Sequence, residues 1–171
     1  MHYGRISCPD IANGTGVRVA IFVSGCTNHC DQCFQPQTWD FNYGELYTQE
    51  TEDMIIEKLK GNYITGLTIL GGEPMELQNQ EELYKLATRV KAEYPQKTVW
   101  CYTGFKYEDL LPGGKRYGDH TDEFLDHIDV LVDGRFEIAK KDIRLKFRGS
   151  SNQRLIDMKS TRNSGTVVEL D

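Results

Sequence analysis

A repeated alternation of apolar runs and helical segments constrains the fold of this chain more than any other feature. Apolar and β-branched residues fill four short runs, at 17–24, 66–72, 97–104 and 129–135. Helical periodicity marks the segments between them, at 48–61, 79–95 and 122–128. Strands that alternate with helices predict parallel βαβ units. An eight-unit barrel needs roughly 250 residues, so 171 residues predict one α/β domain over 1–171, a partial, open β/α barrel with a mainly parallel sheet.

The ends of these segments carry helix signals. Thr48 or Thr51 is the expected N-cap of the first helix, and Gly61 its end. Asn79 is the expected cap of the second helix, and Pro95 marks its end. Residues 111–121 read as a loop, and the irregular region after 136 holds two further predicted strands, at 143–147 and 166–170.

Each of the four predicted strands is followed by an unusual motif. These motifs are GCTNHCDQC (25–33), GGEP (71–74), YTG (102–104) and DGR (133–135). The carboxyl ends of parallel strands meet at one edge of the sheet, where α/β folds bind their ligands. The sequence therefore predicts that all four motifs surround one site.

Three cysteines in the first motif, Cys26, Cys30 and Cys33, follow the spacing C-x3-C-x2-C. Thiolates favour zinc, copper(I) or iron–sulfur clusters. A [4Fe–4S] cluster needs one external ligand per iron, so three cysteines would leave the fourth iron open to a small molecule. A structural zinc site with His29 as fourth ligand is the first alternative, although His29 adjoins Cys30. A disulfide with one spare thiol is the second, and the spacing alone leaves all three readings open.

Composition narrows the class of protein. The formal net charge is −6 and the pI is about 5.3, which argues against a nucleic-acid partner. The first residues, MHYGRISCPD, lack the apolar core of a secretory signal, and no run approaches the roughly 18 apolar residues of a membrane span. We therefore expect a cytoplasmic location and no membrane partner. In a reducing compartment, five cysteines favour metal or redox chemistry over a disulfide framework.

The cysteine motif and GGEP, each after a strand, resemble the radical S-adenosylmethionine enzymes. Within that superfamily, several segments in order resemble the activating proteins of anaerobic ribonucleotide reductase. These segments are NGTGVR (13–18), CFQPQTW (33–39), GGEP followed by QNQ (78–80), YTG, VDGR (132–135) and RGSSNQR (148–154). The resemblance spans about residues 3 to 154, and it implies the open barrel of the radical S-adenosylmethionine type.

The resemblance implies a set of cofactor ligands. Cys26, Cys30 and Cys33 would hold a [4Fe–4S] cluster, and the amino and carboxylate groups of S-adenosyl-L-methionine would chelate the open iron. The methionine amino group would be bound by GGEP, and the adenosyl part by the stretch around the third cysteine. Residues at two strand ends would contact the methionine or the ribose. In that order the implied residues are Gly71, Gly72, Glu73 and Pro74; Gln32, Cys33 and Phe34; and Thr103 and Asp133.

Some of these positions have plain structural readings or depart from the pattern. GGEP reads otherwise as a turn into a helix, and Asp133 as a turn residue before Gly134. Gln32 stands where many superfamily members carry an aromatic residue. NGTGVR has Asn13 and Thr15 where a DGPGxR segment has Asp and Pro.

The resemblance also implies a reaction and partners. A reduced cluster would cleave S-adenosylmethionine, and the 5′-deoxyadenosyl radical would take a hydrogen atom from a glycine Cα of the large reductase subunit. No acid–base side chain is assigned. A flavodoxin-like or similar protein is the expected electron donor, and a homodimer or a heterotetramer with the reductase is left open.

Other functions stay in view. An activator of pyruvate formate-lyase would differ only in its partner, whereas a 7-carboxy-7-deazaguanine synthase would act on a small molecule. A zinc-binding interaction module without catalysis is an alternative of another class. Cys101 reads as a buried apolar residue, Trp39 as packing, and Arg148 and Arg154 as surface charge.

Overall fold

A mixed seven-stranded sheet forms the centre of the computed structural model, which describes residues 1–30, 33 and 36–170. Its order is β3-β1-β2-β4-β5-β6-β7. The middle strands β2, β4, β5 and β6 run parallel, whereas β1, β3 and β7 pair antiparallel at the two sides. The strands are β1 His2–Asp10, β2 Arg18–Val23, β3 Glu45–Leu46, β4 Gly66–Gly71, β5 Thr98–Tyr102, β6 Val130–Asp133 and β7 Arg154–Asp157.

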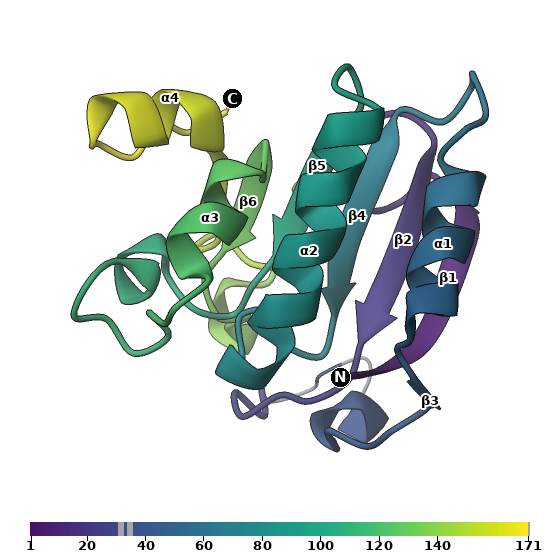
Figure 1. The fold of residues 1–171 in the computed structure, drawn as a ribbon. Helices are drawn as coiled ribbons and strands as arrows, with labels where there is room; N and C mark the ends of the chain where they lie inside the picture. Colours follow the sequence, from purple (N-terminus) through teal and green to yellow (C-terminus); the bar gives the residue numbers. More distant parts are fainter. Residues whose placement is uncertain (31–32, 34–35, 171) are drawn as a thin grey trace.

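Helices α1, α2 and α3 lie on one face of this sheet, where they cover the strands (Figure 1). The helices are α1 Gln49–Lys58, α2 Leu77–Glu93, α3 Thr121–Asp126 and α4 Met158–Ser164. Short 3-10 turns occupy η1 Pro36–Trp39, η2 Tyr107–Leu110 and η3 Ile138–Lys140. No helix among the described residues is long and apolar enough to cross a membrane.

Side chains alternate between the two faces of the sheet. Ile21, Ile69 and Cys101 point into the main core beneath the helices. Trp100 and Val132 belong to a smaller cluster on the opposite face, where the segment after β6 packs on them. Both faces of the parallel strands are therefore covered, which accounts for their nearly continuous apolar sequence.

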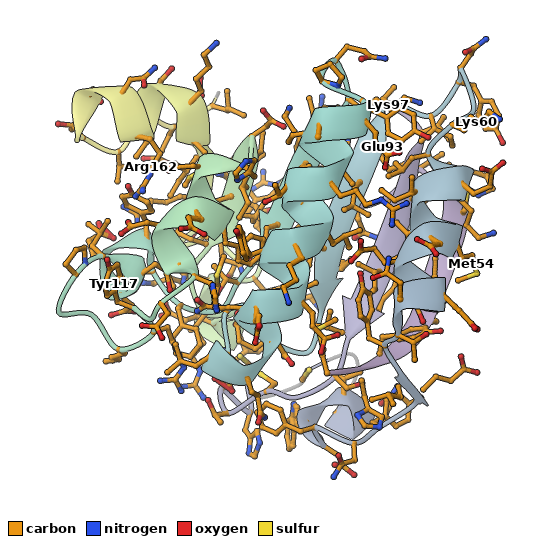
Figure 2. All side chains as sticks on the ribbon, viewed as in Figure 1. Met54, Lys60, Glu93, Lys97, Tyr117 and Arg162 are labelled. Atoms are coloured by element: carbon orange, nitrogen blue, oxygen red, sulfur yellow. The ribbon has the colours of Figure 1, made fainter. Side chains whose placement is uncertain are left out.

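Long polar side chains fasten the connections between elements. Lys97, after α2, donates to the carbonyl oxygens of Leu59 and Gly61 after α1. Arg162 of α4 pairs with Asp122 and Asp126 of α3, at 3.0 Å and 2.9 Å. Figure 2 shows Lys97 and Lys60 close together at one end of the sheet, and Arg162 between α4 and α3.

The four predicted strands and their parallel pairing are confirmed. The N-cap prediction is confirmed at Thr48, whose side chain accepts from the Thr51 amide while Thr51 caps it in return. The predicted cap at Asn79 is wrong, because α2 begins at Leu77 and Asn79 lies inside the helix. Its side chain instead donates to the carbonyl oxygens of Ser24 and Glu73.

The predictions after residue 136 are wrong. Residues 143–147 form turns rather than a strand, and Phe147 has a φ of 62°. In 166–170 only Glu169 makes an isolated bridge, to Ile156. The observed elements there are β7 and α4, whose few residues carry too little periodicity to be recognised. An Asp157 side chain that accepts from the Ser160 amide caps α4.

Candidate functional site

All four motifs meet at one cavity at the carboxyl ends of the parallel strands. The cavity measures about 280 Å³. Each motif contributes to its wall, with Cys26, Cys30, Cys33, Gly71, Gly72, Glu73, Tyr102, Thr103, Gly104 and Gly134 among the lining residues. The prediction that the strand ends converge on one site is thus confirmed.

The cysteine loop, residues 24–40, brings its three thiols to this cavity. Cys26 is buried, whereas Cys30 and Cys33 are partly exposed, and the Cys33 amide donates to the Cys30 carbonyl oxygen at 3.2 Å. All five cysteines of the chain are free. Burial raises the pKa of the Cys26 thiol to about 11, so this thiol keeps its proton at neutral pH unless a metal displaces it.

The thiols share a cavity without being gathered around one ion. Within the described part of the chain, no three Cys, His, Asp or Glu side chains form a group that could hold a metal ion. A four-iron cluster makes a different demand, because each thiolate binds a different iron. His29, the alternative fourth zinc ligand, stacks its ring on Trp39, with centroids 4.2 Å apart.

Glycines let the second motif run against the end of β2 and the cysteine loop. Gly71 has a φ of +115°, and a Cβ there would lie 2.5 Å from the Val23 amide nitrogen. A Cβ on Gly72 would lie 2.7 Å from the Gly25 carbonyl oxygen. The close approach of two backbones explains both glycines. Pro74 is buried beside them and is not among the residues that line the cavity.

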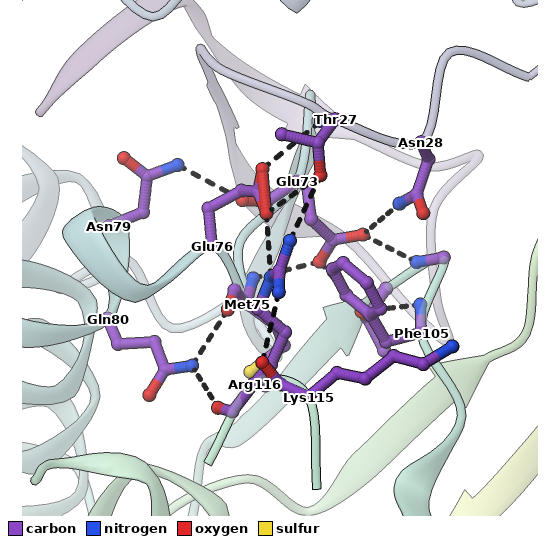
Figure 3. Close-up of polar contacts among 12 residues, drawn as sticks. Thr27, Asn28, Glu73, Met75, Glu76, Asn79, Gln80, Phe105, Lys115 and Arg116 are labelled. Atoms are coloured by element: carbon purple, nitrogen blue, oxygen red, sulfur yellow. Dashed lines mark hydrogen bonds and ion pairs between the residues drawn. The ribbon is translucent and has the colours of Figure 1, made fainter. Parts of the chain in front are cut away.

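Glu73 joins three of the strand-end segments (Figure 3). Its carboxylate is 1% exposed. One oxygen accepts from Asn28 Nδ2 at 3.0 Å and the Gly104 amide at 2.6 Å. The other accepts from the Met75 amide at 2.8 Å and Thr103 Oγ1 at 2.7 Å. Burial raises the pKa of Glu73 to about 7, and the hydrogen bonds from Thr103, Met75 and Gly104 oppose that rise.

Asp133 is fully buried and its carboxylate faces other protein groups. It pairs with Arg154 at 3.0 Å and 2.5 Å and accepts from the Tyr107 amide at 2.8 Å. It is not among the residues that line the cavity, although Gly134 next to it is. Its contact with a methionine or ribose stays a prediction. Gln32 and Phe34, also predicted to bind the adenosyl group, lie outside the described residues.

Three residues that line the cavity each carry a buried polar atom, and the sequence placed only one of them, Tyr102 within YTG, at the site. Trp39 Nε1, the Tyr102 hydroxyl and Arg148 Nε have no hydrogen-bond partner among the described residues. Buried polar atoms are nearly always paired, so three unpaired donors around one cavity indicate a polar ligand. No spacing rule connects these positions, which are brought together only by the fold.

Comparisons with known proteins find relatives over most of the chain. Residues 12–156 match the family model described as a 4Fe-4S single cluster domain. Over 155 residues the chain is 41% identical to the anaerobic ribonucleoside-triphosphate reductase-activating protein of Enterobacteria phage T4, which covers 91% of this chain and 93% of that protein. The proteins of the same name from Vibrio cholerae and Escherichia coli K12 are 41% and 39% identical, each match covering 90% of this chain and 96% of the relative.

Proposed function

This chain belongs to the family of anaerobic ribonucleoside-triphosphate reductase-activating proteins, and from that premise we propose that it generates a glycyl radical on the large, catalytic subunit of the reductase. In this proposal the chain is a radical S-adenosylmethionine enzyme. The observation that carries the proposal is the cavity where three cysteines, two close-packed glycines and three unpaired donors meet.

The residues present fit an iron–sulfur cluster. Cys26, Cys30 and Cys33 line one cavity as free thiols, and the matched family model describes a single 4Fe-4S cluster. When bound, the cluster supplies the electron that cleaves the S–C5′ bond of S-adenosylmethionine into methionine and the 5′-deoxyadenosyl radical. The protein's part is to hold the three cysteines and to exclude water from the space beside them.

The cavity also fits S-adenosylmethionine, which carries a carboxylate, ribose oxygens and adenine nitrogens. All of these accept hydrogen bonds, and the unpaired atoms of Trp39, Tyr102 and Arg148 are donors. Leu70, Val132 and Phe136 supply apolar walls. We assign the methionine end to the GGEP segment and Thr103, where Glu73 fixes the positions of the surrounding backbone amides.

The fold and partners extend the same proposal. The parallel strands with helices on one outer face suit a partial, open β/α barrel of the radical S-adenosylmethionine type, formed by residues 1–171 as one domain. The substrate is a glycine in a peptide segment, which an open barrel can admit. A flavodoxin-like protein is the proposed electron donor, the cytoplasm the proposed location, and a homodimer or a heterotetramer with the reductase the proposed assembly.

The test uses anaerobically reconstituted protein with S-adenosylmethionine and dithionite, with and without the large reductase subunit. We expect 5′-deoxyadenosine, and a glycyl-radical doublet by electron paramagnetic resonance only when the subunit is present. Cys26→Ala, Cys30→Ala and Cys33→Ala should each lose both signals. Cys101→Ala is the matched control, because Cys101 is a fully buried core residue that does not line the cavity.

Two results would contradict the proposal. Bound zinc with no cleavage would leave a zinc-binding interaction module. Cleavage without a doublet would retain the radical chemistry and assign a different substrate, such as another glycyl-radical enzyme or a small molecule.

A further inference from the structure

The cysteine loop is fastened to the start of α2 by a buried carboxylate that belongs to no recognised motif. Glu76 has a side chain that is 4% exposed. Its two oxygens accept from the amide and the hydroxyl of Thr27, each at 3.1 Å. Thr27 directly follows Cys26, so Glu76 holds the backbone next to the first thiol.

Arg116 completes this contact from a distant part of the chain. Its Nε donates to Glu76 at 2.9 Å, and its Nη2 donates to Thr27 Oγ1 at 3.2 Å. One guanidinium therefore binds both partners of the Glu76–Thr27 contact, and Figure 3 shows the three side chains converging. Arg116 lies in the segment 111–121, which the sequence indicates only as a loop.

The guanidinium and its backbone are both held in place. The Arg116 guanidinium carbon lies 4.5 Å from the centroid of the Phe105 ring. Its carbonyl oxygen accepts from Gln80 at 2.9 Å and from Thr121 at 3.3 Å, which ties the segment to α2 and α3. Arg116 is thus a fixed cation and not a freely moving surface side chain.

The burial of Glu76 makes this cation necessary. A buried carboxylate is costly unless it is paired, and removal of one partner leaves the other charge uncompensated. The other ion pairs among the described residues, such as those of Arg89 with Glu52 and Asp53 or of Arg154 with Asp133, do not involve the cysteine loop. The Arg116–Glu76 pair differs because its carboxylate also binds the cysteine loop.

We propose that Arg116 is a positioning residue, which acts through Glu76 to hold Thr27 and thereby fixes the cysteine loop beside the first thiol. The name of the cluster that the loop would hold rests on the proposed function. The clamp itself is a property of the protein without a cluster. Without Arg116, the loop should open more often at Thr27 and release a bound cluster faster.

The first test measures amide hydrogen exchange in the iron-free protein. In Arg116→Gln we expect the Thr27 amide to exchange about tenfold faster, because its charge-assisted acceptor is no longer held. Glu76→Gln should have a similar effect, and the double variant should be no worse than either single variant, since both act through one contact. Arg116→Lys, which keeps the charge, should restore most of the protection.

The second test uses the reconstituted protein. Arg116→Gln should lose iron to an added chelator several-fold faster than wild type and shift the electron paramagnetic resonance of the reduced cluster. Arg89→Gln is the matched control, because Arg89 is a partly exposed arginine that pairs with Glu52, Asp53 and Glu93 and makes no contact with the described residues of the cysteine loop. It should leave both readouts unchanged.

Unchanged Thr27 amide exchange and unchanged iron release in Arg116→Gln would overturn the proposal. Arg116 would then only hold its own segment of the chain in place. If Arg116→Gln does not fold, the test uses Glu76→Gln and Arg116→Lys. A Thr27 amide that exchanges at the wild-type rate in Glu76→Gln would overturn the proposal equally. The exchange result needs no S-adenosylmethionine. A clamp that responds as expected in a protein that cleaves nothing would refute the proposed function alone.

Discussion

Replacement of Glu73 by Gln removes a charge from the centre of the candidate site with little change in volume. Burial raises the pKa of this carboxyl from 4.5 to about 7. In the unfolded chain the carboxyl loses its proton near its ordinary pKa of 4.5, whereas in the folded protein it keeps the proton up to a pH of about 7. Between the two, the folded state binds more protons, so the free energy of unfolding falls as pH rises.

The size of the effect follows from the two pKa values. The stabilisation is complete below the unfolded pKa and is lost as pH rises through about 7. Integration gives a loss of about 2.5 kcal/mol between about pH 5 and about pH 8. Gln cannot ionise, so its free energy of unfolding lacks this component. The difference between wild type and variant should therefore move by about 2.5 kcal/mol against the wild type over that range.

Urea denaturation of the two iron-free proteins at several pH values measures this difference. Subtraction of one curve from the other cancels the titration of groups that both proteins share. A difference that does not change with pH would refute the reasoning, since it would mean that the four hydrogen bonds to Glu73 fully offset its burial. A difference that moves in favour of the wild type as pH rises would refute it as well.

Three other predictions test the scaffold, each through the free energy of unfolding in denaturant. Arg18→Met should destabilise the protein by about 3 kcal/mol, because this fully buried guanidinium donates to three backbone carbonyl oxygens that would each lose this donor; a loss below about 1 kcal/mol would contradict that. Asp133→Ala should also cost about 3 kcal/mol, because it leaves Arg154 with only the exposed Glu108 and removes the acceptor of the Tyr107 amide, and Asp133→Ala with Arg154→Met should recover part of the loss. Thr48→Ala should cost about 1 kcal/mol through the lost cap of α1, and an unchanged midpoint would exclude that role.

The parallel part of the sheet could be predicted from the sequence because each strand is a nearly continuous apolar run. Strands buried on both faces read as continuous runs, and β2, β4, β5 and β6 all do so. β1 could not be found in this way. Its sequence HYGRISCPD mixes polar and apolar residues, and it forms because β2 offers it an antiparallel edge.

The location of the site was also contained in the sequence. Motifs that follow parallel strands must meet at one edge of the sheet, so the order of strands and motifs is enough to place Cys26, Gly71 and Thr103 together. The partners of these residues could not be found in the same way. Asn79 has the sequence position of a helix cap, yet its amide fastens the cysteine loop because the helix starts earlier.

The sequence by itself determined the order of the four parallel strands and the helices between them, the three thiols and the edge where they gather, because these depend on periodicity and spacing within short segments. Only the tertiary structure decided which side chains hold that edge together. Glu73 meets Gly104 across 31 residues, and Arg116 meets Thr27 across 89. Such contacts follow from how packed elements face one another, and no local pattern in the chain records that geometry.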